Sequence, residues 1–279
     1  MMTALLRQPF VENAFIAGTL IAVASAVVGY FVVLRGQAFA AHALSHIGFA
    51  GATLAVLIGT SPLLGISWFT VAAALAMGAF GKRIRGRDVE IGIVLAFALG
   101  LGVLFLKLYT RSASETASIL FGSIFSVTRA NIIGTIIMGC ASLLLLAAIF
   151  RPLLFSSIDP EAAETRGVPI KPLSVLFMFL LAITVAEAIQ VVGILLVFAL
   201  IVAPASIAQH ITRKPFSAIA LAVALGIAFV WCGLLLSLAT SLPVSFYIAA
   251  LAAVSYFIAV GLSHIVRPHA AEGREHTCR

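Results

Sequence analysis

The sequence predicts an all-α polytopic membrane protein: about nine transmembrane helices, one short re-entrant or interfacial helix and one short cytoplasmic helix. Of its 279 residues, 62% are hydrophobic and 10% are charged, whereas a soluble domain has about 45–50% apolar and about 25% charged residues. So few charged side chains cannot cover the surface of a soluble protein, and the mean hydropathy of +1.19 agrees with this. The apolar residues also form long stretches, with the basic residues in short runs between them.

The apolar stretches define the transmembrane segments one by one. Most have about the 20 residues that a helix needs to cross a bilayer. They cover residues 12–34, 39–59, 62–80, 89–108, 130–150, 172–189, 190–209, 217–239 and 243–266. The boundary between residues 189 and 190 has the weakest sequence signal. Residues 116–128 are apolar but too short to span a bilayer, which suits the re-entrant or interfacial helix.

The basic residues orient these segments. They form four groups: Lys82, Arg83, Arg85 and Arg87; Arg151, Arg166 and Lys171; Arg213 and Lys214; and Arg267, Arg274 and Arg279. With nine spans all four groups lie on one side, which the positive-inside rule makes the cytoplasm. The prediction is one transmembrane domain over residues 1–266, with its N-terminus outside, followed by a polar cytoplasmic tail over residues 267–279.

The rest of the composition excludes some classes of protein. The net charge of +7 and the pI near 9.8 do not indicate nucleic acid binding, because the basic residues lie in the loops of a membrane protein. Two of the three cysteines, Cys140 and Cys232, lie inside apolar stretches, and Cys278 is next to the C-terminus. This spacing predicts neither a disulfide framework nor a zinc ribbon.

Two histidines in the second apolar stretch are candidate metal ligands. Charged side chains at the centre of a membrane helix cost about 2.5–3.5 kcal/mol on insertion scales, so each ionisable group there needs an explanation. His42 and His46 are four residues apart, so both imidazoles leave one face of a helix near mid-bilayer and can hold a transition-metal ion. Ser45 and Thr53 are expected to extend this face. The alternative is a structural pair satisfied by neighbouring helices.

Glu187 is a further ionisable residue inside a predicted span. Thr184 and Gln190 lie three residues to either side of it, so the three form a polar stripe near the outer end of the sixth span. Glu187 can attract a cation at the entrance of a pathway, and the alternative is a carboxylate that reaches water at the membrane interface. A group near the C-terminus has irregular spacing and is expected to be solvated: His264, His269, His276 and Cys278.

The loop after the fifth span contains a separate short helix, over residues 159–167. Asp159 suits the N-cap and Pro160 the first helical position, Glu161 complements the helix dipole, and Gly167 can end the helix in a left-handed conformation. Such a helix has little to bury unless a partner protein covers it, and the alternative is a linker on the membrane surface. The chain has no Gly-x-x-x-x-Gly-Lys-Ser/Thr motif, so ATP chemistry must come from another subunit.

Five sequence motifs follow one another between Pro9 and Val266. They are Val-Val-Leu-Arg at 32–35, Ala-His-Ala-Leu-Ser-His at 41–46, Leu-Phe-Gly at 120–122, Leu-Leu-Phe-Ser-Ser-Ile-Asp-Pro-Glu-Ala-Ala at 153–163 with Gly167, and Val-Val-Gly-Ile-Leu-Leu-Val at 191–197 followed by Ala-Pro-Ala at 203–205. In this order and spacing the chain resembles the permease subunits of bacterial ABC importers for zinc, manganese and iron.

The resemblance implies a homodimeric or paired permease in the bacterial inner membrane, working with a cytoplasmic ATPase and an extracytoplasmic metal-binding protein. It implies that the short loop helix is a cytoplasmic coupling helix that contacts the ATPase through Asp159, Pro160, Glu161, Ala162, Glu164 and Gly167. In the family the motif at 41–46 usually reads Gly-Asp-Ala-Leu-Ser-His, so His46 matches an ion contact and His42 replaces a carboxylate. An imidazole in place of a carboxylate favours zinc over manganese.

We therefore expect the chain to move a divalent metal inward by alternating access: zinc by this argument, or else manganese or iron. No permanently bound cofactor and no bond-making reaction are expected of the chain itself, and ATP is hydrolysed on the partner ATPase. One alternative is a gradient-driven secondary carrier with His42, His46 and Glu187 as a proton relay. An intramembrane metalloenzyme is disfavoured, since the histidine pair has no carboxylate between its members.

Overall fold

The computed structural model describes residues 8–79, 87–109, 122, 124–240 and 242–266. Within these residues nine helices are long and apolar enough to cross a membrane, which confirms the predicted fold class. The helices are α2 (Pro9–Leu34), α3 (Ala38–Leu57), α4 (Pro62–Ala79), α5 (Arg87–Leu108), α7 (Arg129–Ile158), α8 (Pro160–Thr165), α9 (Ile170–Val192), α10 (Ile194–Ile211), α11 (Pro215–Thr240) and α12 (Val244–Val266), with a 3₁₀ helix η1 (Ile124–Ser126).

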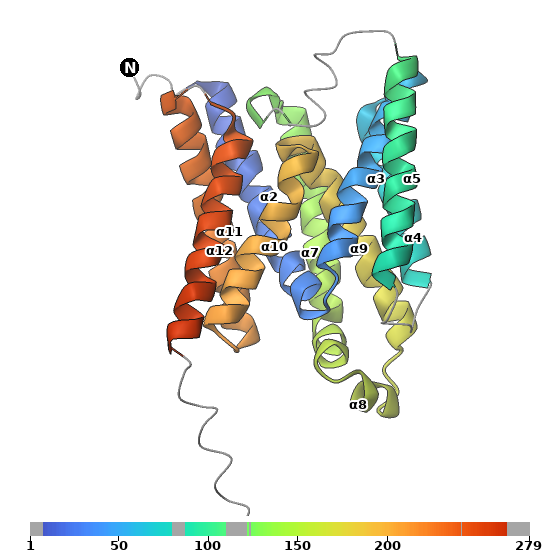
Figure 1. Ribbon diagram of the computed structural model, residues 1–279, viewed down its shortest axis with the longest axis vertical. Coiled ribbons are helices and arrows are strands. Elements are labelled where there is room, and N and C mark those ends of the chain that lie inside the picture. Colours follow the sequence, from blue (N-terminus) through green and yellow to red (C-terminus); the bar gives the residue numbers. More distant parts are fainter. Residues whose placement is uncertain (1–7, 80–86, 110–121, 123, 241, 267–279) are drawn as a thin grey trace, which may run out of the picture.

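The long helices run side by side as one bundle (Figure 1). In the most apolar window of each helix, 67% of the residues of α2 and 72% of those of α3 and α9 are buried, against 17% for α5 and α12. The bundle therefore has α2, α3 and α9 at its centre, and α5 and α12 present their apolar side chains outward, as lipid-facing helices do. The short helix α8 extends beyond the end of the bundle opposite to the N-terminal end of α2 (Figure 1).

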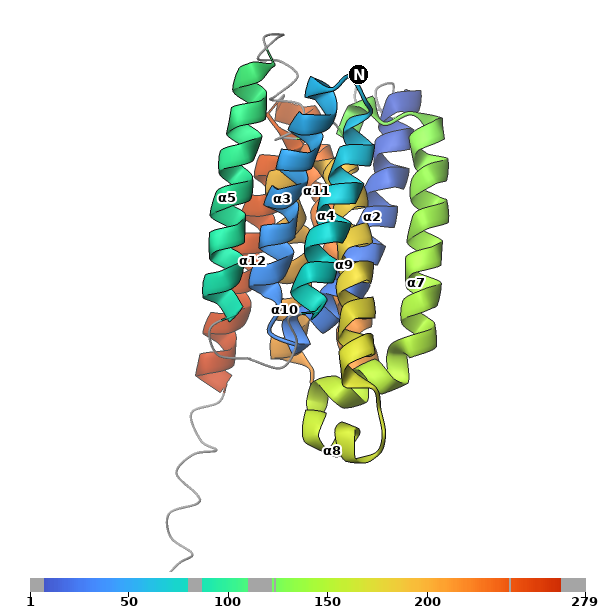
Figure 2. The same ribbon diagram turned by 90° about the vertical axis from the view of Figure 1, so that its right-hand side faces the viewer.

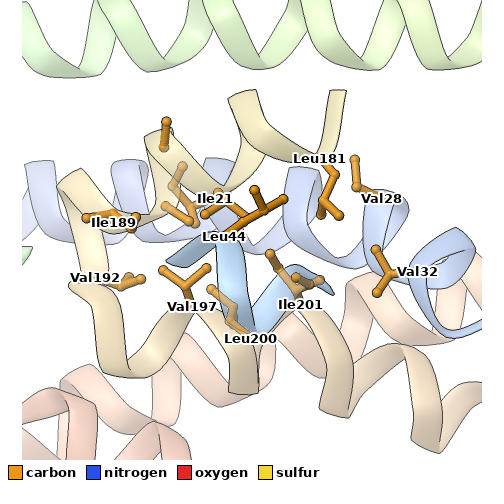
Figure 3. Close-up of a cluster of buried hydrophobic side chains, with 14 of the residues drawn as sticks. Ile21, Val28, Val32, Leu44, Leu181, Ile189, Val192, Val197, Leu200 and Ile201 are labelled. Carbon is orange, nitrogen blue, oxygen red and sulfur yellow. The ribbon is translucent and has the colours of Figure 1, made fainter. Parts of the chain in front are cut away.

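The centre of the bundle is a layer of branched aliphatic side chains. Figure 3 shows them converging from α2, α3, α9 and α10, among them Ile21, Leu44, Leu181 and Ile201. Gly29 allows α2 and α10 to approach closely, because a Cβ atom at this position would lie 2.0 Å from the carbonyl oxygen of Ile201. Backbone contact at small residues is the usual way in which membrane helices pack, since lipid provides no hydrophobic drive between them.

Two predicted helix ends are wrong. The boundary between the sixth and seventh spans lies at Gly193, which has a φ of 82°, and not between residues 189 and 190. The residues from Ile189 to Val192, including the polar Gln190, continue α9, and only a glycine adopts the positive φ of residue 193 without strain. Helix α7 continues to Ile158 through Pro152, eight residues beyond the predicted end at 150, and Figure 2 shows it turning towards α8 there.

The structure describes one of the two predicted short helices in full and the other only in part. The short helix predicted in the loop after the fifth span is present as α8, with its predicted bounds matched to within about two residues. The predicted helix over residues 116–128 falls mostly outside the described residues, and within it Ile124–Ser126 forms η1. The predicted tail over 267–279 also lies outside the described residues.

Candidate functional site

His42 and His46 project from the same face of α3 and contact each other. Their ring centroids are 4.6 Å apart with an angle of 78° between the ring planes, as expected for positions one helical turn apart. The ring of His42 also lies 5.0 Å from the ring of Phe198 on α10. Its Nδ1 atom is buried and has no hydrogen-bond partner. A buried ring nitrogen without a partner is available to a ligand.

The two histidines are the accessible residues in the middle of helix α3. From Ala40 to Thr53, all residues except the two histidines are buried, and both histidines are partly exposed. The predicted extension of this polar face is wrong: the hydroxyls of Ser45 and Thr53 are buried and donate hydrogen bonds to backbone carbonyls of α3 itself. The polar opening is therefore confined to the two imidazoles.

The two histidines do not form a complete metal site within the described residues. There, no group of three or more histidine, cysteine, aspartate or glutamate side chains is placed to hold one ion. Divalent transition metals in resident protein sites usually take four or more ligands. The pair can offer two imidazole nitrogens to an ion whose other ligands come from water or from another chain.

Glu187 lies apart from the histidine pair, on a face of α9 that points away from α3. It is 6% exposed and lines a cavity between α4, α7 and α9 together with Gln190. The alternative of a carboxylate that reaches water at the membrane interface is wrong, because α9 continues to Val192 and the side chain is buried. Thr184 does not add to this cavity, since its hydroxyl is buried and donates to the carbonyl of Leu180.

Helix α8 is built by the capping residues that the sequence indicates. Asp159 Oδ1 accepts a hydrogen bond of 2.9 Å from the backbone N–H of Ala162, Pro160 takes the first helical position, and Gly167 has a φ of 79°. Ala163 is fully buried against the bundle, whereas Glu161 and Glu164 are exposed. One face of α8 is thus packed on this chain, and an acidic face points away from it.

Arg35 ties α2 to the two helices that flank α8, a role that the sequence did not reveal. Its Nη1 donates to Ser157 Oγ at 3.3 Å on α7, and its Nη2 donates to Ser174 Oγ at 2.7 Å on α9. Its guanidinium also lies 5.5 Å from the ring centroid of Phe177. Ser157 is two residues before the N-cap of α8, so Arg35 connects the end of α2 to the segment that leads into α8.

Known proteins resemble the chain over nearly its whole length. The profile of the ABC 3 transport family matches residues 7–263. The manganese transport system membrane protein MntC of Listeria monocytogenes is 31% identical over 256 residues, which cover 91% of each protein. The manganese import system permease protein ScaB of Streptococcus parasanguinis is 31% identical over 250 residues, which cover 89% of each.

The fold is also that of a solved transporter chain. A chain of the structure described as PsaBC from Streptococcus pneumoniae in complex with Fab superimposes with a TM-score of 0.81 and 28% identity, covering 92% of this chain and 93% of that one. Sequence and structure thus agree with the resemblance carried by the motifs between Pro9 and Val266. The chain belongs to the ABC 3 transport family.

Proposed function

We propose that the chain is the transmembrane permease subunit of an ATP-driven importer of divalent metal ions, with manganese as the cargo. The observation that carries the proposal is the partial exposure of His42 and His46 within the buried middle of α3, residues 40–53, in an ABC transport family member. Manganese is favoured by the relatives, since the MntC and ScaB proteins are named for manganese transport.

Zinc is the second candidate cargo, and the chemistry of the pair favours it. Two imidazoles present nitrogen ligands, which suit zinc better than manganese, whereas manganese prefers oxygen ligands. The family's usual Asp at the position of His42 would supply one such oxygen. The relatives and the ligand chemistry therefore point to different metals, and transport selectivity has to be measured.

The exposed histidine pair supports a pathway between two permease chains. A transported ion needs a route that water or another chain completes, and polar groups inside membrane proteins face a bundle interior or a water-filled cavity. A second copy of the chain, packed over α3 and α10, would enclose the pair and supply the same ligands again. In this arrangement the ion passes at the level of His42 and His46 while the two permeases open alternately to either side.

Helix α8 is proposed to receive the motion of a cytoplasmic ATPase. Its acidic residues Glu161 and Glu164 are exposed, whereas Ala163 is buried against the bundle. Movement of α8 would reach α2 and α9 through the hydrogen bonds of Arg35 with Ser157 and Ser174. The proposed orientation puts α8 and the C-terminus in the cytoplasm, and an extracytoplasmic binding protein delivers the metal to the opposite end.

The experiment that tests the proposal is metal uptake by the purified transporter. The tagged chain is extracted in mild detergent, the proteins that copurify are identified by mass spectrometry, and the preparation is reconstituted into liposomes. We expect a stoichiometric P-loop ATPase and ATP-dependent uptake of manganese that zinc inhibits less strongly than unlabelled manganese does. Uptake by this chain alone, driven by an ion gradient without ATP, would instead establish a secondary carrier.

A further inference from the structure

A cavity of about 400 Å³ lies on the side of α9 that faces away from the histidine pair. It is lined by residues of α4, α7 and α9, and α4 and α7 flank α9 on its two sides (Figure 2). Five of the residues that line it have side-chain oxygen atoms: Ser67, Asn131, Thr135, Glu187 and Gln190. The described lining includes no imidazole and no thiol, so the cavity differs in chemistry from the site on α3.

Glu187 is the one ionisable side chain in that lining, and it lacks partners. The side chain is 6% exposed, and neither carboxylate oxygen makes a hydrogen bond. Gly139 of α7 allows the carboxylate to sit close to that helix, because a Cβ there would lie 3.7 Å from Glu187 Oε2. A buried carboxylate without a partner is strongly unfavourable, so a positive charge or a proton must accompany it.

The cavity is separated from the histidine pair by α9 itself. Ile189 reaches α3, where its Cδ1 lies 2.7 Å from the position of a Cβ built on Gly48. Residues two positions apart on an α-helix point about 200° apart, so Glu187 points away from α3. The cavity therefore does not share its ligands with the proposed transport pathway.

The cavity lies near the end of the bundle that is opposite to α8. Gln190 is two residues from the C-terminal end of α9, and Asn131 is two residues from the start of α7. Both ends lie away from α8 in Figure 2. A ligand would thus reach the cavity from the side where the proposed delivery protein binds.

We propose that this cavity binds a monovalent metal cation, with Glu187 as the charged ligand and the neighbouring hydroxyl and amide oxygens as neutral ligands. Oxygen ligands suit hard cations. One carboxylate and one monovalent cation form a neutral pair, whereas a divalent cation would leave an uncompensated charge in a low-dielectric region. The cation would join α4, α7 and α9 at their outer ends. This inference stands independently of which metal the transporter carries.

The test is the thermal stability of the purified transporter as sodium replaces choline at constant ionic strength, without manganese or zinc. A ligand that binds only the folded state stabilises it in proportion to the logarithm of its concentration, so we expect a saturable rise in Tm of about 2–4 °C. Glu187→Gln should abolish the sodium dependence. Glu12→Gln should retain it, because Glu12 is exposed at the same end of the bundle, on α2, and does not line the cavity.

A second variant and a binding measurement cover the case in which Glu187→Gln fails to fold. Radioactive sodium should bind the wild-type transporter with a stoichiometry of about one per permease chain, and Thr135→Val should weaken this binding while keeping the side-chain shape. Three results would overturn the proposal: a wild-type Tm that does not respond to sodium, a response that survives both substitutions, or stabilisation through Glu187 by manganese in place of sodium. The first would mean that a proton neutralises the carboxyl group.

Discussion

The region of the candidate ion sites on α3 and α9 contrasts with the region around α8. At the candidate sites, His42 Nδ1 and both carboxylate oxygens of Glu187 are buried and have no hydrogen-bond partner. At the α8 end, Arg35 is bonded to Ser157 and Ser174, and Asp159 caps α8. Polar groups that the chain leaves without partners are available to ions, whereas bonded ones hold helices together. Substitutions should therefore change ion handling in the first region, and coupling or assembly in the second.

The largest effect is expected for His46→Ala. If the imidazole contacts the passing ion, ATP-dependent metal uptake in proteoliposomes should fall by at least about tenfold, while the amount of copurifying ATPase stays the same. His210→Ala is the matched control, because His210 is an exposed histidine at the C-terminal end of α10 whose ring contacts its own helix. Unchanged uptake in His46→Ala would mean that His46 does not contact the passing ion. The difference proposed between the two regions would then be wrong.

The long helices and α8 follow from the sequence because their signals are local. Apolar length defines the spans, and the capping residues of α8 lie within nine positions of one another. The break at Gly193 was misplaced because the polar residue Gln190 interrupts the apolar sequence three positions earlier, whereas α9 continues through it to Val192. The end of α7 was misplaced because Arg151 and Pro152 indicate a helix end, whereas the helix continues through both.

The surroundings of the candidate residues follow from the sequence only in part. Helical spacing placed His42 and His46 side by side, and the contact of their rings confirms this. The burial of Glu187 depends on α4 and α7, which pack against α9 from distant parts of the chain. The bonds of Arg35 join residues 122 and 139 positions apart. No periodicity in a single sequence indicates such long-range partners.

The next largest effect is expected for Arg35→Ala, which tests the bonded region. Hydrogen bonds to a charged group contribute about 1.5–3 kcal/mol to stability when they are well buried. Because Arg35 is partly exposed, we expect its removal to lower the stability by an amount near the lower value. The ratio of ATP hydrolysed to metal transported should rise, because motion of α8 reaches α2 less directly. Arg35→Lys keeps the charge but cannot bond both serines as the planar guanidinium does, so its ratio of ATP hydrolysed to metal transported should lie between those of the wild type and Arg35→Ala. A normal ratio in both variants would contradict a mechanical role.

A smaller effect is expected for His42→Asp, which sharpens the description of the unpartnered region. A carboxylate oxygen in place of an imidazole nitrogen should shift selectivity from zinc towards manganese, by about three- to tenfold in relative uptake, or about 0.7–1.4 kcal/mol. Uptake of both metals is measured in competition. His42→Asn separates charge from ligand type, because it offers a neutral oxygen. Identical selectivity in the wild type and in both variants would mean that His42 does not contact the ion during the selective step.

The smallest effect is expected for Asp159→Ala, because it removes one cap from a short exposed helix. Loss of an N-cap costs about 1 kcal/mol of helix stability. If α8 must be helical in the complex, this corresponds to about fivefold weaker binding of the ATPase. The measurement is the fraction of ATPase retained as salt is raised during purification. Asp159→Ser keeps a capping hydroxyl without the charge, and so it should restore retention. If it does not, the carboxylate itself contacts the ATPase, and Asp159 belongs with the side chains that the chain leaves for a partner.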